Sequence, residues 1–308
     1  MFRGTAPAKI ILFGEHAVVY GQPAIAAPVN SLFAEAIASP INSPFHLIAL
    51  DLESQQIPLT AEHSLALAAR LTFNALELSP PQASIQIRST IPLASGLGSG
   101  AAISAAIVRS ICSLMEQRLS DEQINEIVYE VEKIYHGTPS GIDNTVIVYN
   151  QVVYFVRGEP IQHLQVKRPL RLLIADTGRK ALTKIAVGDV RKLVEANPGK
   201  YTSIIEQIGT IAKQAQAAMS SGELDRLGIL MDENHCLLDQ LTVSSPELET
   251  LVNAARQAGA AGAKLSGGGR GGNMIALCTE ETKSSVRSAL EQAGAQRIIE
   301  TTIAATEE

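Results

Sequence analysis

The stretch PLASGLGSGAAISAA (Pro92–Ala106) decides the fold prediction for this chain. The segment before it, Ala83–Ile91, alternates apolar and polar residues, which predicts a strand. After it, small and apolar residues continue to Leu119 without a helix breaker, which predicts a helix. A strand, a glycine-rich loop and a helix N-terminus in succession direct free backbone N–H groups at an anion. We therefore predict that the loop binds a phosphate group, and we interpret it as the phosphate of a nucleotide.

Two common phosphate-binding patterns do not account for this loop. Gly96-x-Gly98-x-x-Ala101 matches the dinucleotide fingerprint, but that fold needs a second strand ending in an acidic residue about 20 residues later. Helical sequence occupies that region instead, including a predicted capping box at Ser120–Gln123. The Walker A pattern needs a lysine after the loop, and none follows. Glycine and alanine runs also permit close helix packing, but the strand–loop–helix order favours a phosphate site.

The composition argues against several classes of function. The 308 residues carry a net charge of -6 and only 4% aromatic side chains, so nothing favours binding to nucleic acid or to an anionic membrane surface. The three cysteines, Cys112, Cys236 and Cys278, are far apart and lack CxxC spacing, which favours a reducing compartment. We find no signal-peptide pattern and no apolar window of membrane-spanning length. We therefore expect a cytoplasmic protein that binds neither nucleic acid nor membrane.

Strand and helix signals mix without strict alternation, which favours an α+β fold with two domains. A composition shift near Glu159–Pro169 predicts domains of residues 1–165 and 166–308. Residues 39–60, rich in Pro, Ser and Gln, are expected to form a surface meander. Thr145–Tyr149 and Val152–Val156 are expected to pair as a hairpin around Asn150 and Gln151.

A second motif, HGTPSGIDN (His136–Asn144), presents an acidic residue on a segment whose glycines and proline oppose helix formation. Taken alone, Asp143 is most simply a capping or turn aspartate. Glu132 lies near the end of the preceding predicted helix, from which it could meet Asp143 across the turn. Two carboxylates beside a phosphate site suit both metal binding and general-base catalysis.

Two further segments carry ambiguous signals. Lys9 interrupts the apolar strand in PAKIILFGEHAVVYG (Pro7–Gly21), so it is either an edge residue facing water or a buried ammonium group with a partner. SGGGRGG (Ser266–Gly272) places five glycines among seven residues. That is more glycine than a plain turn requires.

Together these segments resemble the GHMP kinase superfamily and, within it, the mevalonate kinase family. The superfamily motifs stand in order at residues 7–21, 92–102 (PLASGLGSGAA) and 264–277 (KLSGGGRGGNMIAL). EKIYHGTPSGIDN (132–144) is similar to the family's catalytic segment, and DTGRKALTKIAVGDV (176–190) is similar to its DTG segment. The resemblance spans nearly the whole chain. It implies an N-terminal domain like ribosomal protein S5 domain 2, a C-terminal ferredoxin-like domain and a homodimer.

The resemblance also implies a reaction, in which the γ-phosphoryl group of ATP passes to the C5 hydroxyl of (R)-mevalonate with Mg²⁺ as cofactor. Asp143 and Lys9 would be the catalytic residues, because Asp143 would accept the hydroxyl proton and Lys9 would stabilise the developing alkoxide. Glu132 and Ser99 would bind the metal ion. The expected ATP-binding residues are Pro92, Ala94, Ser95, Gly96, Leu97, Gly98, Ser99, Gly100, Ala101 and Ala102. The expected substrate-binding residues are Lys9, Glu15, His16, Asp143, Thr183, Gly268 and Gly269.

The first glycine loop departs from the family pattern at Gly100. Relatives usually read GLGSS, with the second serine associated with Mg²⁺, whereas this chain has Gly100 there. Either Ser99 replaces that serine, a water fills the gap, or the metal binds more weakly.

Two other functions compete with this interpretation. A phosphomevalonate kinase, or another small-molecule kinase of the superfamily, could use Arg179, Lys180 and Lys184 for a phosphorylated substrate. A catalytically silent ligand sensor on the same fold is the other alternative. The presence of Lys9, Asp143 and Glu132 argues against a sensor.

Overall fold

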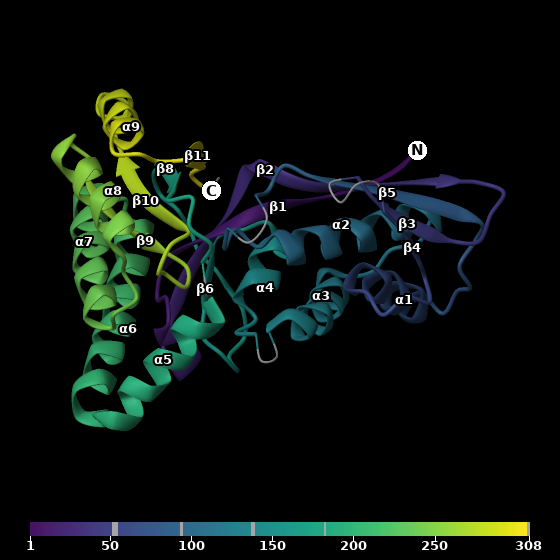
Figure 1. The fold of residues 1–308 in the computed structure, drawn as a ribbon, viewed down its shortest axis with the longest axis horizontal. Helices are drawn as coiled ribbons and strands as arrows, with labels where there is room; N and C mark the ends of the chain where they lie inside the picture. Colours follow the sequence, from purple (N-terminus) through teal and green to yellow (C-terminus); the bar gives the residue numbers. More distant parts are fainter. Residues whose placement is uncertain (51–54, 93–94, 137–138, 182, 307–308) are drawn as a thin grey trace. The chain divides into compact units, whose positions relative to one another are not determined.

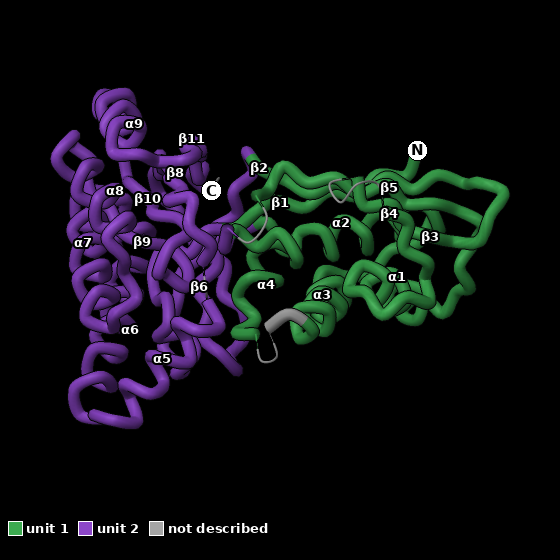
Figure 2. The backbone as a smooth tube through the Cα atoms, viewed as in Figure 1, with its two compact units in different colours: residues 1–9, 32–93, 97–150 green, residues 10–31, 94–96, 151–308 purple. Residues whose placement is uncertain are grey.

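The computed structural model describes residues 1–50, 55–92, 95–136, 139–181 and 183–306 (Figure 1). The chain divides into two compact units, which Figure 2 distinguishes by colour. Unit 1 comprises Met1–Lys9, Leu32–Leu93 and Leu97–Asn150, and unit 2 comprises Ile10–Ser31, Ala94–Gly96 and Gln151–Glu308. The α+β class is confirmed. The contiguous division at residues 165 and 166 stays a prediction, whereas the compact units share the strands β1 (Phe2–Phe13) and β2 (Ala24–Pro40).

Unit 1 is a sheet with helices along one face (Figure 1). β5 (Ala83–Ser89) pairs antiparallel with Ala34–Pro40 of β2 and parallel with β3 (His46–Ala49), and β3 pairs with β4 (Gln55–Pro58). The alternation in β5 is confirmed, because Ile85 and Ile87 are buried while Gln86 and Arg88 are exposed. The helices are α1 (Ser64–Leu76), α2 (Ser99–Leu114), α3 (Asp121–His136) and α4 (Ile142–Tyr149).

The capping box at the start of α3 is confirmed. Ser120 N donates to Gln123 Oε1 over 2.9 Å, and Gln123 N donates to Ser120 Oγ over 3.3 Å. These two bonds satisfy N–H groups that the first helical turn leaves without partners. The helix that carries Glu132 therefore begins where the sequence places it.

Two local predictions were wrong. Residues 39–60 contain β3 and β4, whose inward side chains Leu47 and Ile57 are buried. Residues 145–149 belong to α4, and the expected hairpin does not form, because β6 (Val153–Phe155) pairs with β2 instead. Val146, Ile147 and Val148 are all buried in α4. Burial of these β-branched side chains in the helical layer outweighs their preference for strands.

Unit 2 contains a four-stranded antiparallel sheet in the order β11 (Arg297–Ile303), β8 (Leu170–Asp176), β10 (Asn273–Cys278) and β9 (Gly262–Ser266). Its helices are α5 (Thr183–Ala196), α6 (Pro198–Ser221), α7 (Leu224–Gln240), α8 (Pro246–Gln257) and α9 (Lys283–Gln292). β7 (Gln162–His163) pairs with β6, which itself pairs with β2.

Helix α7 packs directly on the backbone of the edge strand β9. A Cβ on Gly228 would lie 2.0 Å from Ala261 O, and a Cβ on Gly262 would lie 2.1 Å from Gly228 O. Only glycine permits this approach. The close packing brings polar side chains of α7 within reach of the β9 backbone.

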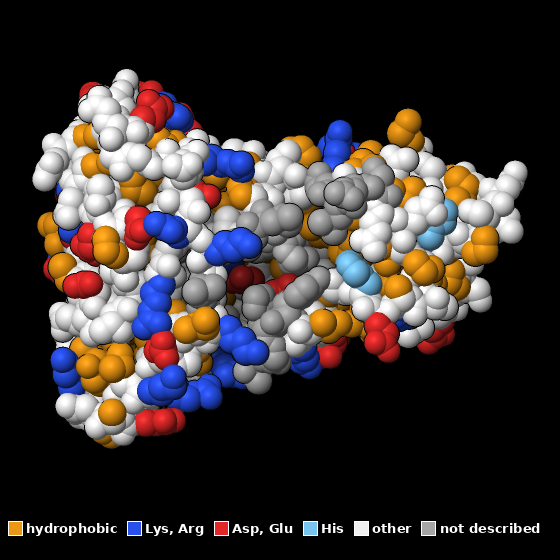
Figure 3. Space-filling model, in the orientation of Figure 1, with side chains coloured by type: hydrophobic (Ala, Val, Ile, Leu, Met, Phe, Trp, Pro, Cys, Tyr) orange, Lys and Arg blue, Asp and Glu red, His pale blue; other side chains and the backbone are white. Residues whose placement is uncertain are grey.

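The surface of unit 2 carries a local group of basic side chains. Figure 3 shows Lys and Arg gathered over α5, where Lys184, Arg191 and Lys192 are exposed. Among the described residues, no helix is both long and apolar enough to cross a membrane.

Candidate active site

Lys9 and Asp143 form an ion pair within unit 1. Lys9 Nζ lies 2.8 Å from Asp143 Oδ1, and the two side chains are 4% and 33% exposed. β1 supplies the lysine, and the first turn of α4 supplies the aspartate, just after the left-handed Gly141 (φ 94°). The sequence left open whether Lys9 faces water; the structure buries it with a partner. The pair combines a shielded cation with a carboxylate that a small molecule can reach.

The first glycine loop turns sharply into α2. Gly98 adopts φ 78° as the N-cap, and a Cβ there would lie 2.7 Å from Ile147 Cδ1 and 3.0 Å from Lys9 Cγ. Lys9 N also donates to Leu97 O over 3.0 Å, which attaches β1 to the loop. The unpaired N–H groups and the dipole at the start of a helix favour an anion there. The loop thus holds a helix N-terminus beside Lys9.

The predicted ATP-binding residues fall in both units. Pro92 and Leu97–Ala102 belong to unit 1, Ser95 and Gly96 belong to unit 2, and Ala94 lies outside the described residues. A Cβ on Gly96 would meet no described atom within 4 Å, and this residue adopts φ 79°. In unit 2, Asn273 Nδ2 donates to Ser95 O over 2.6 Å. The backbone at Gly96 is therefore open, whereas the residue before it is fixed.

Glu132 is a buried carboxyl group on α3, with 4% exposure. Burial raises its pKa to about 7; the negative charge of Asp143 acts in the same direction and Lys9 opposes it. A Cβ on Gly100 would lie 3.0 Å from Glu132 Oε1, so the carboxylate lies directly against the first turn of α2. In the same turn, Ser99 Oγ is buried without a hydrogen-bond partner among the described residues. Burial of ionisable and unsatisfied groups of this kind marks functional sites.

Replacing Glu132 with glutamine is expected to stabilise the metal-free protein at alkaline pH. A carboxyl group whose pKa rises on folding stabilises the native state below its unfolded pKa, and this contribution is lost as the pH rises through the folded pKa. The difference in free energy of unfolding between variant and wild type should therefore move in favour of glutamine from pH 5 to pH 8. With a folded pKa near 7, the upper limit is about 3 kcal/mol. Urea unfolding in EDTA at four pH values measures this difference.

Glu130→Gln provides the matched control, because Glu130 lies on the same helix with a half-exposed side chain. That substitution should leave the pH dependence of the free energy of unfolding unchanged. Parallel curves for Glu132→Gln and wild type would contradict the assignment of a raised pKa to Glu132.

In unit 2 a strained turn presents His16. Gly14 adopts φ 90°, and a Cβ there would lie 2.4 Å from Pro23 O; His16 itself adopts φ 61°. His16 Nε2 lies 3.0 Å from Gly268 O. Burial lowers the pKa of His16 to about 4, the bond to Gly268 opposes this, and Arg270 lowers it further. A neutral ring that donates from Nε2 to a carbonyl keeps Nδ1 as an acceptor.

Glu15, the neighbour of His16, forms an ion pair with Lys264 of β9, and both side chains are fully buried. Lys264 Nζ also donates to Leu265 O over 2.7 Å. Removing one member of such a pair leaves an uncompensated buried charge. The carboxylate of Glu15 thus fixes the turn that carries His16. Lys264 is not among the predicted site residues, although a lysine in the apolar segment GAKLS is the signal that could have identified it.

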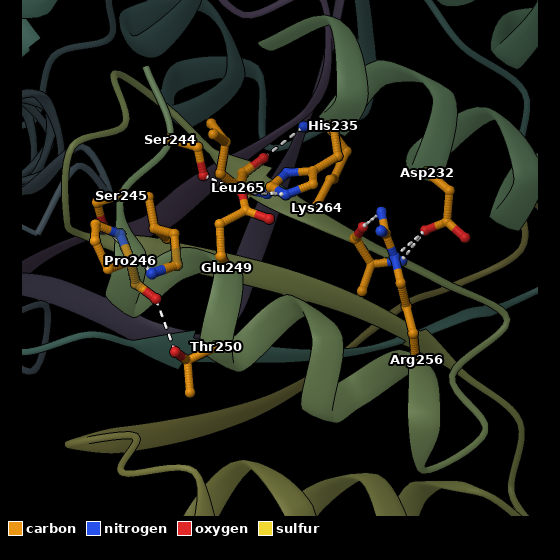
Figure 4. A network of polar contacts seen from close by, with 12 residues as sticks. Asp232, His235, Ser244, Ser245, Pro246, Glu249, Thr250, Arg256, Lys264 and Leu265 are labelled. Carbon is orange, nitrogen blue, oxygen red and sulfur yellow. Dashed lines mark hydrogen bonds and ion pairs between the residues drawn. The ribbon is translucent and has the colours of Figure 1, made fainter. Parts of the chain in front are cut away.

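Side chains from α7 and α8 hold the outer edge of β9 (Figure 4). Leu265 N donates to His235 Nδ1 over 3.2 Å, and Ala263 N donates to Asp232 Oδ1 over 2.9 Å. His235 Nε2 in turn lies 2.9 Å from Glu249 Oε1. These bonds satisfy backbone groups that an edge strand leaves unpaired. They fix the strand whose next segment is the second glycine loop.

That loop lies against the start of α5. A Cβ on Gly268 would lie 2.6 Å from Thr183 Oγ1 and 2.8 Å from its Cα, so the two backbones are in direct contact. Gly269 has φ 74°, and a Cβ there would lie 2.0 Å from Val243 O. Thr183 is exposed. Within unit 2 the structure therefore brings together His16, Gly268 and Thr183, three of the residues expected on the substrate side, whereas Glu15 faces Lys264.

Comparisons with known proteins identify the family of this chain. The family model for the GHMP kinase N-terminal domain matches residues 63–151, and the model for the GHMP kinase C-terminal domain matches residues 215–296. The mevalonate kinase of Thermococcus gammatolerans is 35% identical over 319 residues, covering 96% of this chain and 94% of its own. That of Thermococcus onnurineus is 37% identical over 321 residues, with the same shares covered.

A solved structure extends the similarity to the fold. The L. major mevalonate kinase in complex with R-mevalonate superimposes with a TM-score of 0.87 and 30% identity, covering 100% of this chain and 97% of that one. The two family models match in the order that the motifs predict, and both relatives are more than 30% identical over nearly the whole chain. The chain therefore belongs to the GHMP kinase superfamily and, within it, to the mevalonate kinase family.

Proposed function

We propose that the protein transfers the γ-phosphoryl group of ATP to the C5 hydroxyl of (R)-mevalonate, giving 5-phosphomevalonate and ADP. The observation that carries the proposal is the 2.8 Å ion pair between buried Lys9 and accessible Asp143, beside a glycine loop that opens a helix. The relatives of the same family are mevalonate kinases, and the solved relative from L. major holds R-mevalonate.

In this mechanism Asp143 is the general base. An alcohol holds its proton about as tightly as water does, so attack on phosphorus requires a proton acceptor. The C5 oxygen forms a bond to the γ-phosphorus, the bond from that phosphorus to the bridging oxygen of ADP breaks, and the hydroxyl proton passes to Asp143. The ammonium group of Lys9 stabilises the negative charge that develops on the C5 oxygen. The N–H groups at the start of α2 hold phosphate oxygens.

The metal ion is part of the proposal, and the residues present fit it. Mg²⁺ would neutralise charge on the β- and γ-phosphates. Glu132 supplies a buried carboxylate, and Ser99 supplies a buried hydroxyl without a hydrogen-bond partner in the described chain. Among the described residues, no group of three or more His, Cys, Asp or Glu side chains is arranged so that it could hold a metal ion. Mg²⁺ is commonly held by one or two carboxylates together with substrate phosphates rather than by a protein cage.

Replacing Gly100 with serine is expected to lower the Mg²⁺ concentration that gives half-maximal rate, by about 2- to 10-fold, because one added oxygen ligand contributes on the order of one hydrogen bond. The substitution places a hydroxyl beside Glu132 Oε1, which lies 3.0 Å from the position of the new Cβ. The measurement is initial rate against Mg²⁺ at fixed ATP. Gly100→Ala, which adds the same Cβ without the hydroxyl, is the control. A serine variant that titrates like the alanine variant would refute the prediction.

Unit 2 supplies the residues that we assign to mevalonate, namely His16, Thr183, Gly268 and Gly269. His16 Nδ1 is an acceptor for a substrate hydroxyl, because its Nε2 faces Gly268 O. Glu15 acts through this turn, since its carboxylate is wholly buried against Lys264. We also propose that the enzyme is a cytoplasmic homodimer, on the resemblance alone.

A coupled ADP-release assay with mevalonate, phosphomevalonate, homoserine and galactose tests the function. We expect turnover with mevalonate. The relatives and the solved structure reported above are mevalonate kinases, which weighs against phosphomevalonate. Activity confined to any other compound would overturn the substrate assignment, and absence of turnover with all four would favour the sensor.

A further inference from the structure

Arg270 is the one residue with a side chain among the glycines of residues 267–272. It adopts the left-handed conformation, with φ 57°. Its neighbours Gly269 (φ 74°) and Gly271 (φ 125°) also have positive φ. A residue with a Cβ is strained in this region, whereas glycine is not. A strained residue persists where the surrounding contacts determine it, and such residues concentrate at ligand-binding segments.

The side chain of Arg270 connects the loop to α5. Its Nη1 lies 2.5 Å from Asp189 Oδ2, and the two side chains are 29% and 31% exposed. Its Nε donates to Thr242 O over 3.3 Å, and its backbone N donates to Val243 O over 2.7 Å. The hydrogen bond from Arg270 holds the pKa of Asp189 below its usual value, and Lys192 acts in the same direction. The guanidinium group is thus oriented by Asp189 of the helix on one side and by the Thr242 carbonyl on the other.

Loop and helix therefore meet at two points. Near the start of α5, Thr183 lies against Gly268; farther along the helix, Asp189 pairs with Arg270. His16 Nε2 reaches the carbonyl of the same Gly268. The Arg270–Asp189 ion pair is the second contact between the loop and α5, the helix that supplies Thr183. Neither Arg270 nor Asp189 belongs to the His16–Gly268–Thr183 group.

We propose that Arg270 is a positioning residue, which through its ion pair with Asp189 fixes Thr183 of α5 against Gly268 and His16 in the arrangement that binds the substrate. That the substrate is mevalonate rests on the proposed function; the pairing itself does not. A partly exposed ion pair contributes little to overall stability. Its effect should therefore appear in substrate binding, because small displacements of binding groups have large kinetic costs.

The experiment measures Arg270→Met and Asp189→Asn in the full-length chain. Each is expected to raise the KM for mevalonate about tenfold, with the KM for ATP within about twofold and a similar melting temperature. The double variant should resemble the single ones, because both remove the same interaction. Lys192→Met is the matched control: Lys192 Nζ lies 3.0 Å from Asp189 Oδ1, so the variant removes the other cation near Asp189 and should leave every constant unchanged.

The Arg270→Gly variant distinguishes a positioning role of Arg270 from a role in stabilising the fold. Glycine relieves the left-handed strain, so thermal stability should be retained or increase, while the KM for mevalonate should still rise. Calorimetric titration of mevalonate into ATP-free protein should show the same weakening. A glycine variant with a normal mevalonate KM would overturn the proposal, as would losses that affect mevalonate, ATP and stability alike.

Failure of the positioning role of Arg270 can be distinguished from failure of the proposed function. If wild type turns over another compound of the panel, the substrate assignment fails, and the same variants are measured with that compound. A selective rise in its KM would then support the positioning role, and an unchanged KM would refute it.

Discussion

Replacing Asp143 with asparagine should lower kcat by about 10³-fold while ATP still binds. Asparagine has the same shape and can still accept a hydrogen bond from Lys9, which lies 2.8 Å from the carboxylate in the wild type. It cannot take up the hydroxyl proton. The start of α2 is unchanged, so the nucleotide site should persist. Turnover is measured by ADP release at saturating substrates, and ATP binding by calorimetry.

Asp239→Asn on α7 is the matched control, because Asp239 is an exposed aspartate of unit 2. It should leave kcat unchanged. Near-normal turnover by the Asp143 variant would exclude Asp143 as the base. Loss of both turnover and ATP binding would indicate that the substitution disturbs the loop rather than the proton transfer.

Replacing Lys9 with methionine should lower kcat by about 10²- to 10³-fold, since in the proposed mechanism its ammonium group stabilises the charge that develops on the C5 oxygen. Methionine retains an apolar stem in a position that is 4% exposed, so β1 should remain folded. The KM for ATP should change less than kcat, because the substitution removes an interaction of the ammonium group that is made in the transition state. A variant with unchanged kcat would exclude Lys9 from the chemistry.

The same variant has an expected pH signature. The charge of Lys9 lowers the pKa of Glu132, so its removal raises that pKa further above the wild-type value of about 7. Glu132 then loses its proton only at higher pH, and the acid limb of the Mg²⁺-dependent residual rate should shift to higher pH. Lys133→Met, an exposed change on the same helix, should leave the profile in place. An unshifted acid limb for Lys9→Met would show that ionisation of Glu132 does not control the rate.

Local signals in the sequence were sufficient for much of the fold. The capping box at Ser120 and the glycines of the first loop each act within a few residues. Their effect on the backbone does not depend on the rest of the molecule. The same dependence on local signals explains why residues 145–149 were wrongly predicted to form a strand. Strand propensity there is opposed only by burial against other helices of unit 1, and this is not encoded locally.

The sequence by itself determined the family, the position of the first glycine loop before a helix, and Lys9 and Asp143 as candidate catalytic residues. Each of these depends on residue type and spacing along the chain. Only the tertiary structure decided that Lys9 is buried against Asp143 and that Glu15 pairs with Lys264, 249 residues away. It alone joined Arg270 to Asp189. The physical reason is that the burial and pairing of a charge depend on which distant segments meet around it, and no local pattern specifies that meeting.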